Sequence, residues 1–423
     1  MDRRTFINRV CLTAGAVSVP TWGWTQEVGY DGPFLVHVEA GGGWDTTLMC
    51  DPKGRLHADE ANPTNRTYHR DDIRSPNAPS PLTWAPTQYN DTFFGRYYDR
   101  LLVLNGIDLG TVNHATGRRY MGSGAVRFNT PSLGALLAAS LAPTLGLTYW
   151  SAGGYDVTDS LVVRSRVANA DGLADLTTPN QFPTHFNEEL LYQPEGDFNL
   201  AMGLVRARAQ RRAAASRLPQ LQEGLRNYAR SHSPGQGLDQ MRQFLPDLNG
   251  LQSSVARQVA LALAGYQAGL TCAMSAGGPW SFDTHSDNDD QSAAALTLFY
   301  SAIDEAWRYI EDQGMADRTL LLMTSELGRT PAYNSGEGKD HWPITTAMLM
   351  GTGIRGNRVI GGSTHAQQGR LVNPATLEVV DDEAVGLALT PQQVHLELRD
   401  LLGLTGLPLT EKYPIDAPRI RFL

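Results

Sequence analysis

The sequence has few cysteines and no long apolar run. It contains three cysteines in 423 residues, and one of them, Cys11, lies close to the N-terminus. The other two, Cys50 and Cys272, could pair in an oxidising compartment or remain two separate buried thiols, because the sequence alone does not bring two sulfur atoms within bonding distance. No stretch approaches the ~20 consecutive apolar residues that span a bilayer, so we expect no stable membrane span.

Positive charge is also scarce. The chain has 35 lysines and arginines against 44 aspartates and glutamates, which gives a formal net charge of −9 at pH 7. Proteins that bind nucleic acid through its phosphates carry basic surfaces, so nothing here favours nucleic acid as a partner. An acidic chain can still act on an anionic substrate, because a bound divalent metal can be the largest charge inside a site.

Three local signatures of common enzyme classes are absent. The chain has no phosphate-binding loop that ends in Lys-Ser or Lys-Thr, and no Gly-x-Gly-x-x-Gly nucleotide fingerprint that opens a helix. It also lacks a Gly-x-Ser-x-Gly nucleophile turn, although Gly122-Ser123-Gly124 is superficially similar. These absences argue against nucleotide phosphate cradles and serine-nucleophile elbows as the chemistry of this chain.

The N-terminus predicts export. Arg3 and Arg4 are followed by Thr5-Phe6-Ile7 and then by a weakly apolar run from Val10 to Val19. A paired arginine before a short apolar run is typical of a twin-arginine signal peptide. We therefore expect residues 1–26 to be a signal peptide read by the twin-arginine translocase, and the mature chain to reside in the periplasm or cell envelope.

Four short apolar runs predict buried strands: residues 33–40, 100–106, 318–325 and 345–351. Residues 291–313 carry apolar side chains at helical spacing and end before Gly314, so they predict a helix directly ahead of the third run. This order of helix and strands predicts an α/β fold with a mostly parallel sheet covered on both faces.

The organisation we expect is a single domain over residues 30–423. Between about residues 185 and 276 the pattern is helical throughout, with an Arg- and Ala-rich stretch at 204–217 and another helix around 251–270. We interpret this part as a helical insertion whose charged side chains form a solvated face.

Polar residues follow the predicted strands, where an open α/β sheet binds its ligands. They include carboxylates and imidazoles at Asp45, Asp283, His285, Glu326 and His341. Such a mixed set suits divalent zinc, manganese or iron, and lacks the all-oxygen shell that calcium prefers. Each element also has a plain structural interpretation as a polar turn, a helix cap or a surface loop, because the spacing is non-local.

Four phrases occur in a fixed order: Asp283-Thr284-His285, Thr324-Ser325-Glu326-Leu327-Gly328-Arg329-Thr330-Pro331, Lys339-Asp340-His341-Trp342-Pro343, and Gly361-Gly362-Ser363-Thr364-His365. Together they resemble a large bacterial family that commonly carries twin-arginine signals and is placed in the alkaline-phosphatase and sulfatase superfamily. The resemblance covers residues 34 to 405. It implies an alkaline-phosphatase-like three-layer αβα sandwich and one or two divalent metal ions.

The resemblance also assigns metal ligands residue by residue. Asp45 matches the carboxylate after the first strand, with Glu39 as a substitute. Asp283 with His285 matches the late metal-binding pair, and His341 matches the last histidine. Glu326-Leu327 stands where the superfamily has an Asp-His pair, so the match to a two-metal site is incomplete.

The catalytic residues that the resemblance implies are less specific. The superfamily nucleophile sits at a helix start after the second strand, where this chain offers Thr111, His114 and Thr116. The Cys-x-Pro-x-Arg sulfatase signature is absent. Arg329 and His365 are the residues expected to steady an anionic substrate.

Three functions follow as hypotheses. The first is a metal-dependent hydrolase of phosphate or sulfate esters, with a small molecule or a glycan as substrate and a threonine or a water as the attacking group. The second is an envelope binding or assembly protein that keeps the fold without the chemistry, which Glu326-Leu327 and the missing nucleophile signature favour. The third is a mutase or transferase that uses the same metal site.

Overall fold

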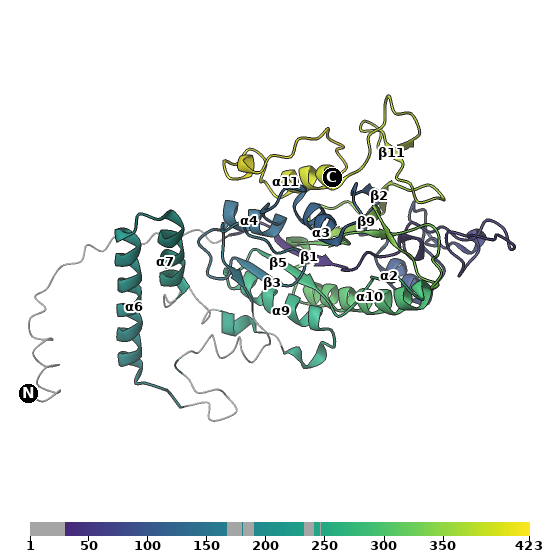
Figure 1. Ribbon diagram of the computed structural model, residues 1–423. Helices are drawn as coiled ribbons and strands as arrows, with labels where there is room; N and C mark the ends of the chain where they lie inside the picture. Colours follow the sequence, from purple (N-terminus) through teal and green to yellow (C-terminus); the bar gives the residue numbers. More distant parts are fainter. Residues whose placement is uncertain (1–29, 167–179, 181–189, 232–240, 246) are drawn as a thin grey trace, which may run out of the picture. The chain divides into compact units, whose positions relative to one another are not determined.

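The computed structural model describes five parts of the chain: residues 30–166, 180, 190–231, 241–245 and 247–423 (Figure 1). The expected signal peptide and parts of the expected helical insertion lie outside the described residues. Among the described residues, no helix combines the length and the apolar composition needed to cross a membrane. The single domain over residues 30–423 stays a prediction.

Eight strands form the central sheet, in the order β10-β2-β9-β6-β1-β5-β3-β4. Their bounds are β1 Phe34–Glu39, β2 Leu102–Asp108, β3 Tyr149–Ala152, β4 Arg164–Ser165, β5 Ala273–Gly277, β6 Thr319–Thr324, β9 Ile344–Gly351 and β10 Arg358–Gly361. All neighbouring strands pair in parallel, except that β9 runs antiparallel to both β2 and β6. The mostly parallel sheet expected from the sequence is confirmed.

Two small two-stranded sheets and the helices complete the part of the chain that the structure describes. The small sheets pair β7 Gly328–Arg329 with β8 His341–Trp342, and β11 Leu371–Val372 with β12 Val379–Val380. The α-helices are α2 Gln88–Tyr97, α3 His114–Ser123, α4 Leu133–Leu141, α6 Glu195–Ala215, α7 Pro219–Ser231, α9 Ser254–Gln267, α10 Asn288–Asp312 and α11 Pro391–Leu401. Short 3-10 helices cover Thr46–Leu48, Arg70–Asp72, Arg242–Phe244, Leu248–Gly250, Ala316–Arg318 and Thr410–Lys412.

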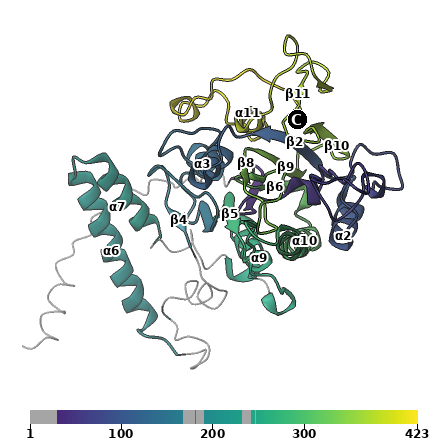
Figure 2. The ribbon, with the colours of Figure 1, turned by 45° about the vertical axis from the view of Figure 1, so that its right-hand side comes forward.

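Helices cover both faces of the sheet. α2, α9 and α10 lie along one face, and α3, α4 and α11 lie along the other (Figures 1 and 2). Contacts agree with this arrangement, because α9 contacts β1, β3 and β5 while α4 contacts β3 and β5. The three layers explain why β1 and β6 are buried along their whole length and are mostly apolar: both sides of the sheet are covered.

The apolar runs that predicted strands form β1, β2, β6 and β9, and the helical spacing at 291–313 forms most of α10. Phe299, Ile303 and Trp307 of that helix are buried, as its spacing requires. Nothing in the sequence indicates that β9 runs antiparallel.

One expectation is corrected by the sheet. Residues 273–276 were expected to end the helical stretch, but they belong to β5, which lies between β1 and β3. The sequence of β5, Ala-Met-Ser-Ala-Gly, has small residues that do not favour a strand by themselves. Hydrogen bonds to two neighbouring strands decide the conformation here. The preceding helix α9 is buried against the sheet and belongs to the central layers.

Cys50 and Cys272 do not pair. Both are free and buried, and each contacts a different part of the fold: Cys50 lies beside Asn105, and Cys272 lies beside Thr148. Burial raises the pKa of the Cys272 thiol to about 12, so the thiol stays protonated at physiological pH. Of the two possibilities, a disulfide or two separate buried thiols, the structure shows two separate buried thiols.

A buried histidine links α11 to α3. His395 of α11 is buried, and its Nε2 lies 2.8 Å from the carbonyl oxygen of Met121. Burial lowers the pKa of His395 to about 3. In the unfolded chain this imidazole binds a proton near pH 6.5, whereas in the folded chain it stays neutral until about pH 3. The histidine therefore makes the folded state less stable as the pH falls from about 6.5 to about 3.

We predict that His395→Gln weakens this pH dependence, because the amide keeps a donor to Met121 but cannot titrate. Between pH 6.5 and pH 5, the wild type should lose about 2 kcal/mol more of its free energy of unfolding than the variant does. Urea unfolding of both proteins at the two pH values measures the difference. Identical losses in the two proteins would contradict the assignment.

Candidate metal centre

The site lies where the parallel strands end. Glu39 is the last residue of β1, Glu326 follows β6, and Asp283 lies in the loop between β5 and α10. Strand β9 is antiparallel, so it begins at the edge where the parallel strands end. The β7–β8 hairpin lies just before β9 in the chain and carries His341 to the same edge. The carboxyl ends of parallel strands are the usual ligand-binding edge of an α/β sheet.

Helix α3 brings His114 to the same edge. Asn113 caps the helix by accepting a hydrogen bond from the backbone N–H of Thr116, so His114 is the first helical residue. Gly117 lets the helix approach the strand end closely, because a Cβ atom there would lie 2.1 Å from the carbonyl oxygen of Glu326. A side chain at position 117 would push His114 away from the strand ends.

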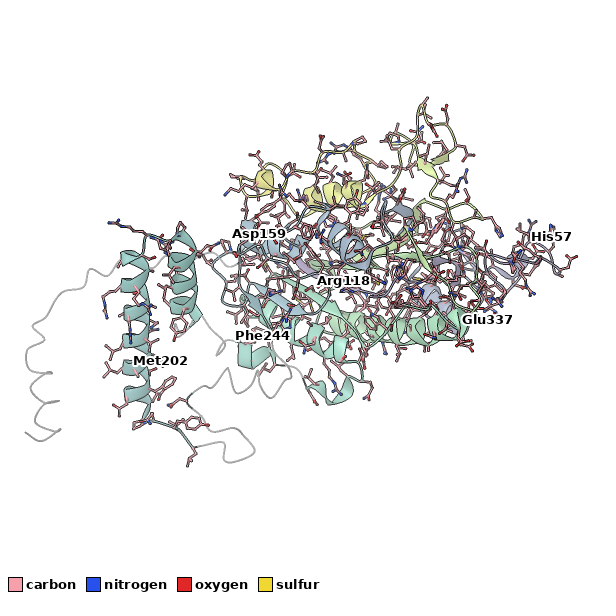
Figure 3. The ribbon with its side chains drawn as sticks, viewed as in Figure 1. His57, Arg118, Asp159, Met202, Phe244 and Glu337 are labelled. Atoms are coloured by element: carbon pink, nitrogen blue, oxygen red, sulfur yellow. The ribbon has the colours of Figure 1, made fainter. Side chains whose placement is uncertain are left out.

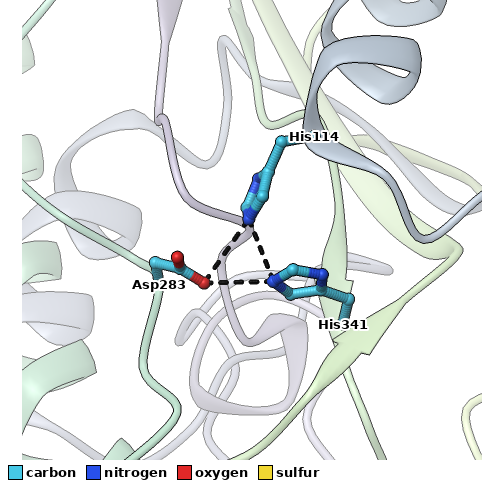
Figure 4. Close-up of side chains that lie close together, drawn as sticks. All are labelled: His114, Asp283 and His341. Atoms are coloured by element: carbon cyan, nitrogen blue, oxygen red, sulfur yellow. Dashed lines mark hydrogen bonds and ion pairs between the residues drawn. The ribbon is translucent and has the colours of Figure 1, made fainter.

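Three imidazoles and one carboxylate converge at this point, and Figure 4 shows two of the imidazoles, His114 and His341, with the carboxylate of Asp283. The Nε2 atom of His341 lies 2.9 Å from Nε2 of His114 and 2.9 Å from Nε2 of His285. Oδ1 of Asp283 is 3.2 Å from Nε2 of His341, 3.2 Å from Nε2 of His285 and 3.5 Å from Nε2 of His114. The donor atoms of His114, Asp283 and His341 all lie within 4.8 Å of one another, which makes these residues a possible metal site.

The outer nitrogen of every imidazole is already used. Each Nδ1 atom lies close to one oxygen: 3.0 Å from Oε1 of Glu326 for His114, 2.8 Å from Oδ1 of Asp340 for His285, and 2.9 Å from the carbonyl oxygen of Val112 for His341. These oxygens accept hydrogen bonds, so each neutral ring carries its proton on Nδ1 and its lone pair on Nε2.

This arrangement fits a cation. Three nitrogen lone pairs and a carboxylate oxygen would repel one another at these distances unless a positive charge lay among them. The hydrogen bond with Glu326 also raises the pKa of His114, so the surroundings favour positive charge. Metal-binding histidines commonly donate their other nitrogen to a carboxylate or a backbone carbonyl, as all three do here. Nitrogen donors with one carboxylate oxygen suit zinc, manganese or iron.

Arg329 holds Asp283 in place. Its side chain is fully buried, and its Nη2 donates to Oδ1 of Asp283 at 2.7 Å. The other guanidinium donors bind the carbonyl oxygens of Gly43, Lys339 and Gly42. Burial alone would raise the pKa of Asp283, but the hydrogen bond and the positive charge of Arg329 outweigh it and lower the pKa to about 2. Arg329 was expected to steady the substrate; in the structure its guanidinium is fully buried and contacts Asp283.

Arg118 joins two buried carboxylates beside the imidazoles. Its Nε donates to Oε1 of Glu39 at 2.5 Å, and its Nη2 lies 3.4 Å from Oε1 of Glu326. Burial, followed by the nearby charge of Glu326, raises the pKa of Glu39 to about 7. Glu39 also accepts a hydrogen bond from the backbone N–H of Tyr155.

An open pocket of about 470 Å³ adjoins the cluster. Five of its lining residues are glycines, which leave room between the strand ends: Gly41, Gly42, Gly154, Gly277 and Gly278. Polar side chains of His114, Arg118, Asp283 and Glu326 also line it. Arg118 lies at the centre of the molecule's stick view (Figure 3), and 43% of its side chain is exposed. The pocket therefore gives solvent and ligands access to the cluster.

Asp45 is not brought to this cluster. It is fully buried at the N-cap of the 3-10 helix Thr46–Leu48, where one carboxylate oxygen accepts from Thr47. The other oxygen accepts from Asn288 and, at 2.7 Å, from the fully buried ammonium group of Lys339. The carboxylate that was expected to bind metal is instead paired with a lysine, and Glu39, the substitute, lies beside the cluster.

Three further expected residues lie outside the pocket lining. Thr111 accepts a hydrogen bond from the backbone N–H of Asn113, and Thr116 belongs to the N-terminal turn of α3, but neither lines the pocket. His365 lies 3.7 Å from Glu60. By contrast His285, Glu326 and His341 are brought together as expected, with His114 among the donor atoms.

Arg118, Asp340 and the carbonyl of Val112 were missed in the sequence. Arg118 had a signal, because it stands four residues after His114 and thus on the same face of a helix that starts there. Asp340 lies in a motif directly before His341, but its residue type there does not distinguish a hydrogen-bond partner from a surface carboxylate. Nothing in the sequence points to Val112, whose contribution is a backbone oxygen.

Comparison with known proteins finds a family model that matches part of the chain and several similar solved structures. Residues 195–385 match the model of a family described as "Protein of unknown function (DUF1501)". No curated protein matches the sequence. Among solved structures, Ps i-CgsB is 10% identical with a TM-score of 0.41, and the match covers 91% of this chain and 74% of that one.

Two other similar structures are a sulfatase and a phosphatase. The PsFucS1 sulfatase from Pseudoalteromonas sp. is 11% identical with a TM-score of 0.36, covering 89% of this chain and 69% of that one. A TAB5 alkaline phosphatase mutant with bound Mg is 9% identical with a TM-score of 0.33, covering 76% and 91%. Identities and TM-scores this low do not define an activity for this chain.

We predict that Arg329→Met destabilises the protein. The change would leave three backbone carbonyls without a buried donor and would remove the partner of Asp283, at a cost of about 3–5 kcal/mol in the free energy of unfolding. Urea unfolding measures this cost. Arg370→Met, at an exposed pair with Asp381, serves as the control and should change stability by less than about 1 kcal/mol. Equal effects of the two changes would contradict a positioning role for Arg329.

Proposed function

We propose that this protein is a metal-dependent hydrolase of phosphate or sulfate esters. One observation carries the proposal: the Nε2 atoms of His114, His285 and His341 face one another and Asp283, while all three Nδ1 atoms are bound to oxygens. His114, Asp283 and His341 would hold the ion, with His285 beside them. Zinc, manganese and iron are the metals that this donor set supports.

The chemistry that such an ion would supply is Lewis-acid polarisation of the ester and a lowered pKa for an attacking water. The chain itself contributes the binding of the anion. The exposed part of Arg118 faces the pocket, and a guanidinium can donate several hydrogen bonds to phosphate or sulfate oxygens. The glycines of the pocket wall leave space for the rest of the substrate, either a small molecule or a glycan.

Water is the attacking group in this proposal. Thr111 and Thr116 do not line the pocket, and Ser281 is the hydroxyl side chain among the residues that do. Hydrogen bonds that would activate Ser281 are not among its described contacts, whereas the open pocket admits water to the donor cluster. The lowered pKa of Asp283 keeps this carboxylate ionised, and able to bind a cation, throughout the physiological range.

Export is a separate part of the proposal. The arginine pair and the short apolar run at the N-terminus support delivery to the periplasm or cell envelope through the twin-arginine translocase. That route is compatible with the buried unpaired thiols, because Cys50 and Cys272 lie in different parts of the fold.

A binding or assembly protein is the second candidate. It is favoured by the position of Thr111 and Thr116 outside the pocket and by Arg118, which fills the space between Glu39 and Glu326. The two functions differ in one respect that can be measured: only the hydrolase needs the ion for its activity.

We predict that Asp283→Ala and His341→Ala each weaken metal binding by more than ~100-fold, because a lost ligand should exceed the ~10–100-fold cost of a lost outer hydrogen bond. Hydrolysis of aryl phosphate, phosphodiester and aryl sulfate esters should fall in parallel. Elemental analysis and metal titration measure the first effect, and steady-state kinetics the second.

Two control variants accompany this experiment. His365→Ala should keep both metal and activity, because His365 lies beside Glu60 and outside the pocket lining. Ser281→Ala should keep metal and most activity if water attacks. A metal-free native protein, with no hydrolysis after metal addition, would contradict the proposal and favour the binding role.

A further inference from the structure

Two buried carboxylates beside the cluster of His114, His285, His341 and Asp283 are both in contact with one guanidinium group, that of Arg118. Glu39 and Glu326 are only 5% and 1% exposed, and Arg118 contacts both of them. Oε2 of Glu326 is buried and has no hydrogen-bond partner among the described residues. Buried carboxylates are normally paired with a cation or bound to a metal, so this pair requires positive charge from outside its own strands.

The fold places the guanidinium between the two carboxylates. Arg118 is one helical turn beyond His114, so α3 presents both residues to the same strand ends. Gly41 leaves room for it, since a Cβ atom at that position would lie 3.3 Å from Nη2 of Arg118.

The guanidinium of Arg118 occupies the position beside Glu39 and Glu326 where a second metal ion would have to bind. Arg118 Nε already lies 2.5 Å from Oε1 of Glu39, and a divalent ion would have to approach that oxygen within about 2.0–2.6 Å. Guanidinium and ion therefore exclude each other. Without Arg118, Glu39 and both oxygens of Glu326 would form an acidic recess beside the first cation site.

We propose that Arg118 serves as a built-in second cation, so that the protein holds one divalent ion rather than two. The inference rests on the proposed metal centre of His114, Asp283 and His341, and it adds that this centre is mononuclear. It also explains how Glu326 can stay ionised and hydrogen-bonded to His114 without binding a metal itself.

The test is the number of ions held by wild type and variants. Each protein is equilibrated with excess manganese or zinc, freed of loose metal on a desalting column, and analysed for metal per chain. We expect one equivalent in the wild type and a doubling in Arg118→Ala, where the two carboxylates lose their cation. In Arg118→Ala/Glu39→Gln, the second equivalent should disappear, because one of its two carboxylates is gone.

Arg119→Ala is the matched control. Arg119 is the adjacent arginine on the same helix, but it donates to the carbonyl oxygen of Val126 and stacks on Phe128, so its loss should leave one equivalent. Circular dichroism and thermal unfolding establish that each variant is folded before its metal is counted.

The outcomes separate this inference from the proposed function. Two equivalents in the wild type, or one in a folded Arg118→Ala, would overturn the role of Arg118 while leaving the metal centre intact. No retained ion in the wild type would overturn the metal centre and this inference together. A second equivalent that survives in the double variant would show that the ion binds elsewhere, and would also overturn it.

Discussion

The arrangement of the site depends on one electrostatic constraint: three imidazole nitrogens without protons face one carboxylate oxygen. The Nδ1 atoms of His114, His285 and His341 lie within hydrogen-bond distance of oxygens. Each neutral ring therefore has its lone pair on Nε2, which faces the other donors of the cluster. A positive charge among them turns this repulsion into attraction. Much of the surrounding structure serves this arrangement, including the buried Arg329 that fixes Asp283 and the backbone carbonyl that orients His341.

The sheet topology is what brings these residues together. Parallel strands deliver Glu39, Asp283 and Glu326 to one edge, because the chain leaves each strand there. His341 reaches the same edge from the other direction, since it precedes β9, which runs antiparallel to its neighbours β2 and β6 in the central sheet. The close approach of α3 at Gly117 then adds His114. Residues more than 200 positions apart in the chain, such as His114 and His341, thus become neighbours within 2.9 Å.

The sequence predicted the sheet better than it predicted the site. Long apolar runs identified β1, β2, β6 and β9, because a strand buried on both faces needs such composition. It missed β5, whose small residues become a strand only by pairing with β1 and β3. In the site, His285, Glu326 and His341 came from motifs after strands and are indeed adjacent. Asp45 also follows a strand, but its carboxylate is paired with Lys339, and no local pattern reveals a partner 294 residues away.

The sequence indicates which residues lie in the site better than it indicates what each of them does there. Arg329 belongs to a motif, yet only the folded structure shows that its side chain is fully buried against Asp283. In the sequence Arg118 is one of many arginines, and only the folded chain shows that it contacts both Glu39 and Glu326. Orientation and burial are properties of the folded chain, and spacing in the sequence does not encode them.

The most direct test of the metal centre is X-ray absorption spectroscopy at the metal edge, on protein loaded with one equivalent of zinc or manganese. If the ion binds as we describe, the spectrum shows nitrogen and oxygen neighbours, at about 2.0–2.2 Å for zinc, with the outer-shell scattering of at least two imidazole rings. An all-oxygen shell without imidazole scattering would contradict the account, because the ion would then lie away from His114 and His341.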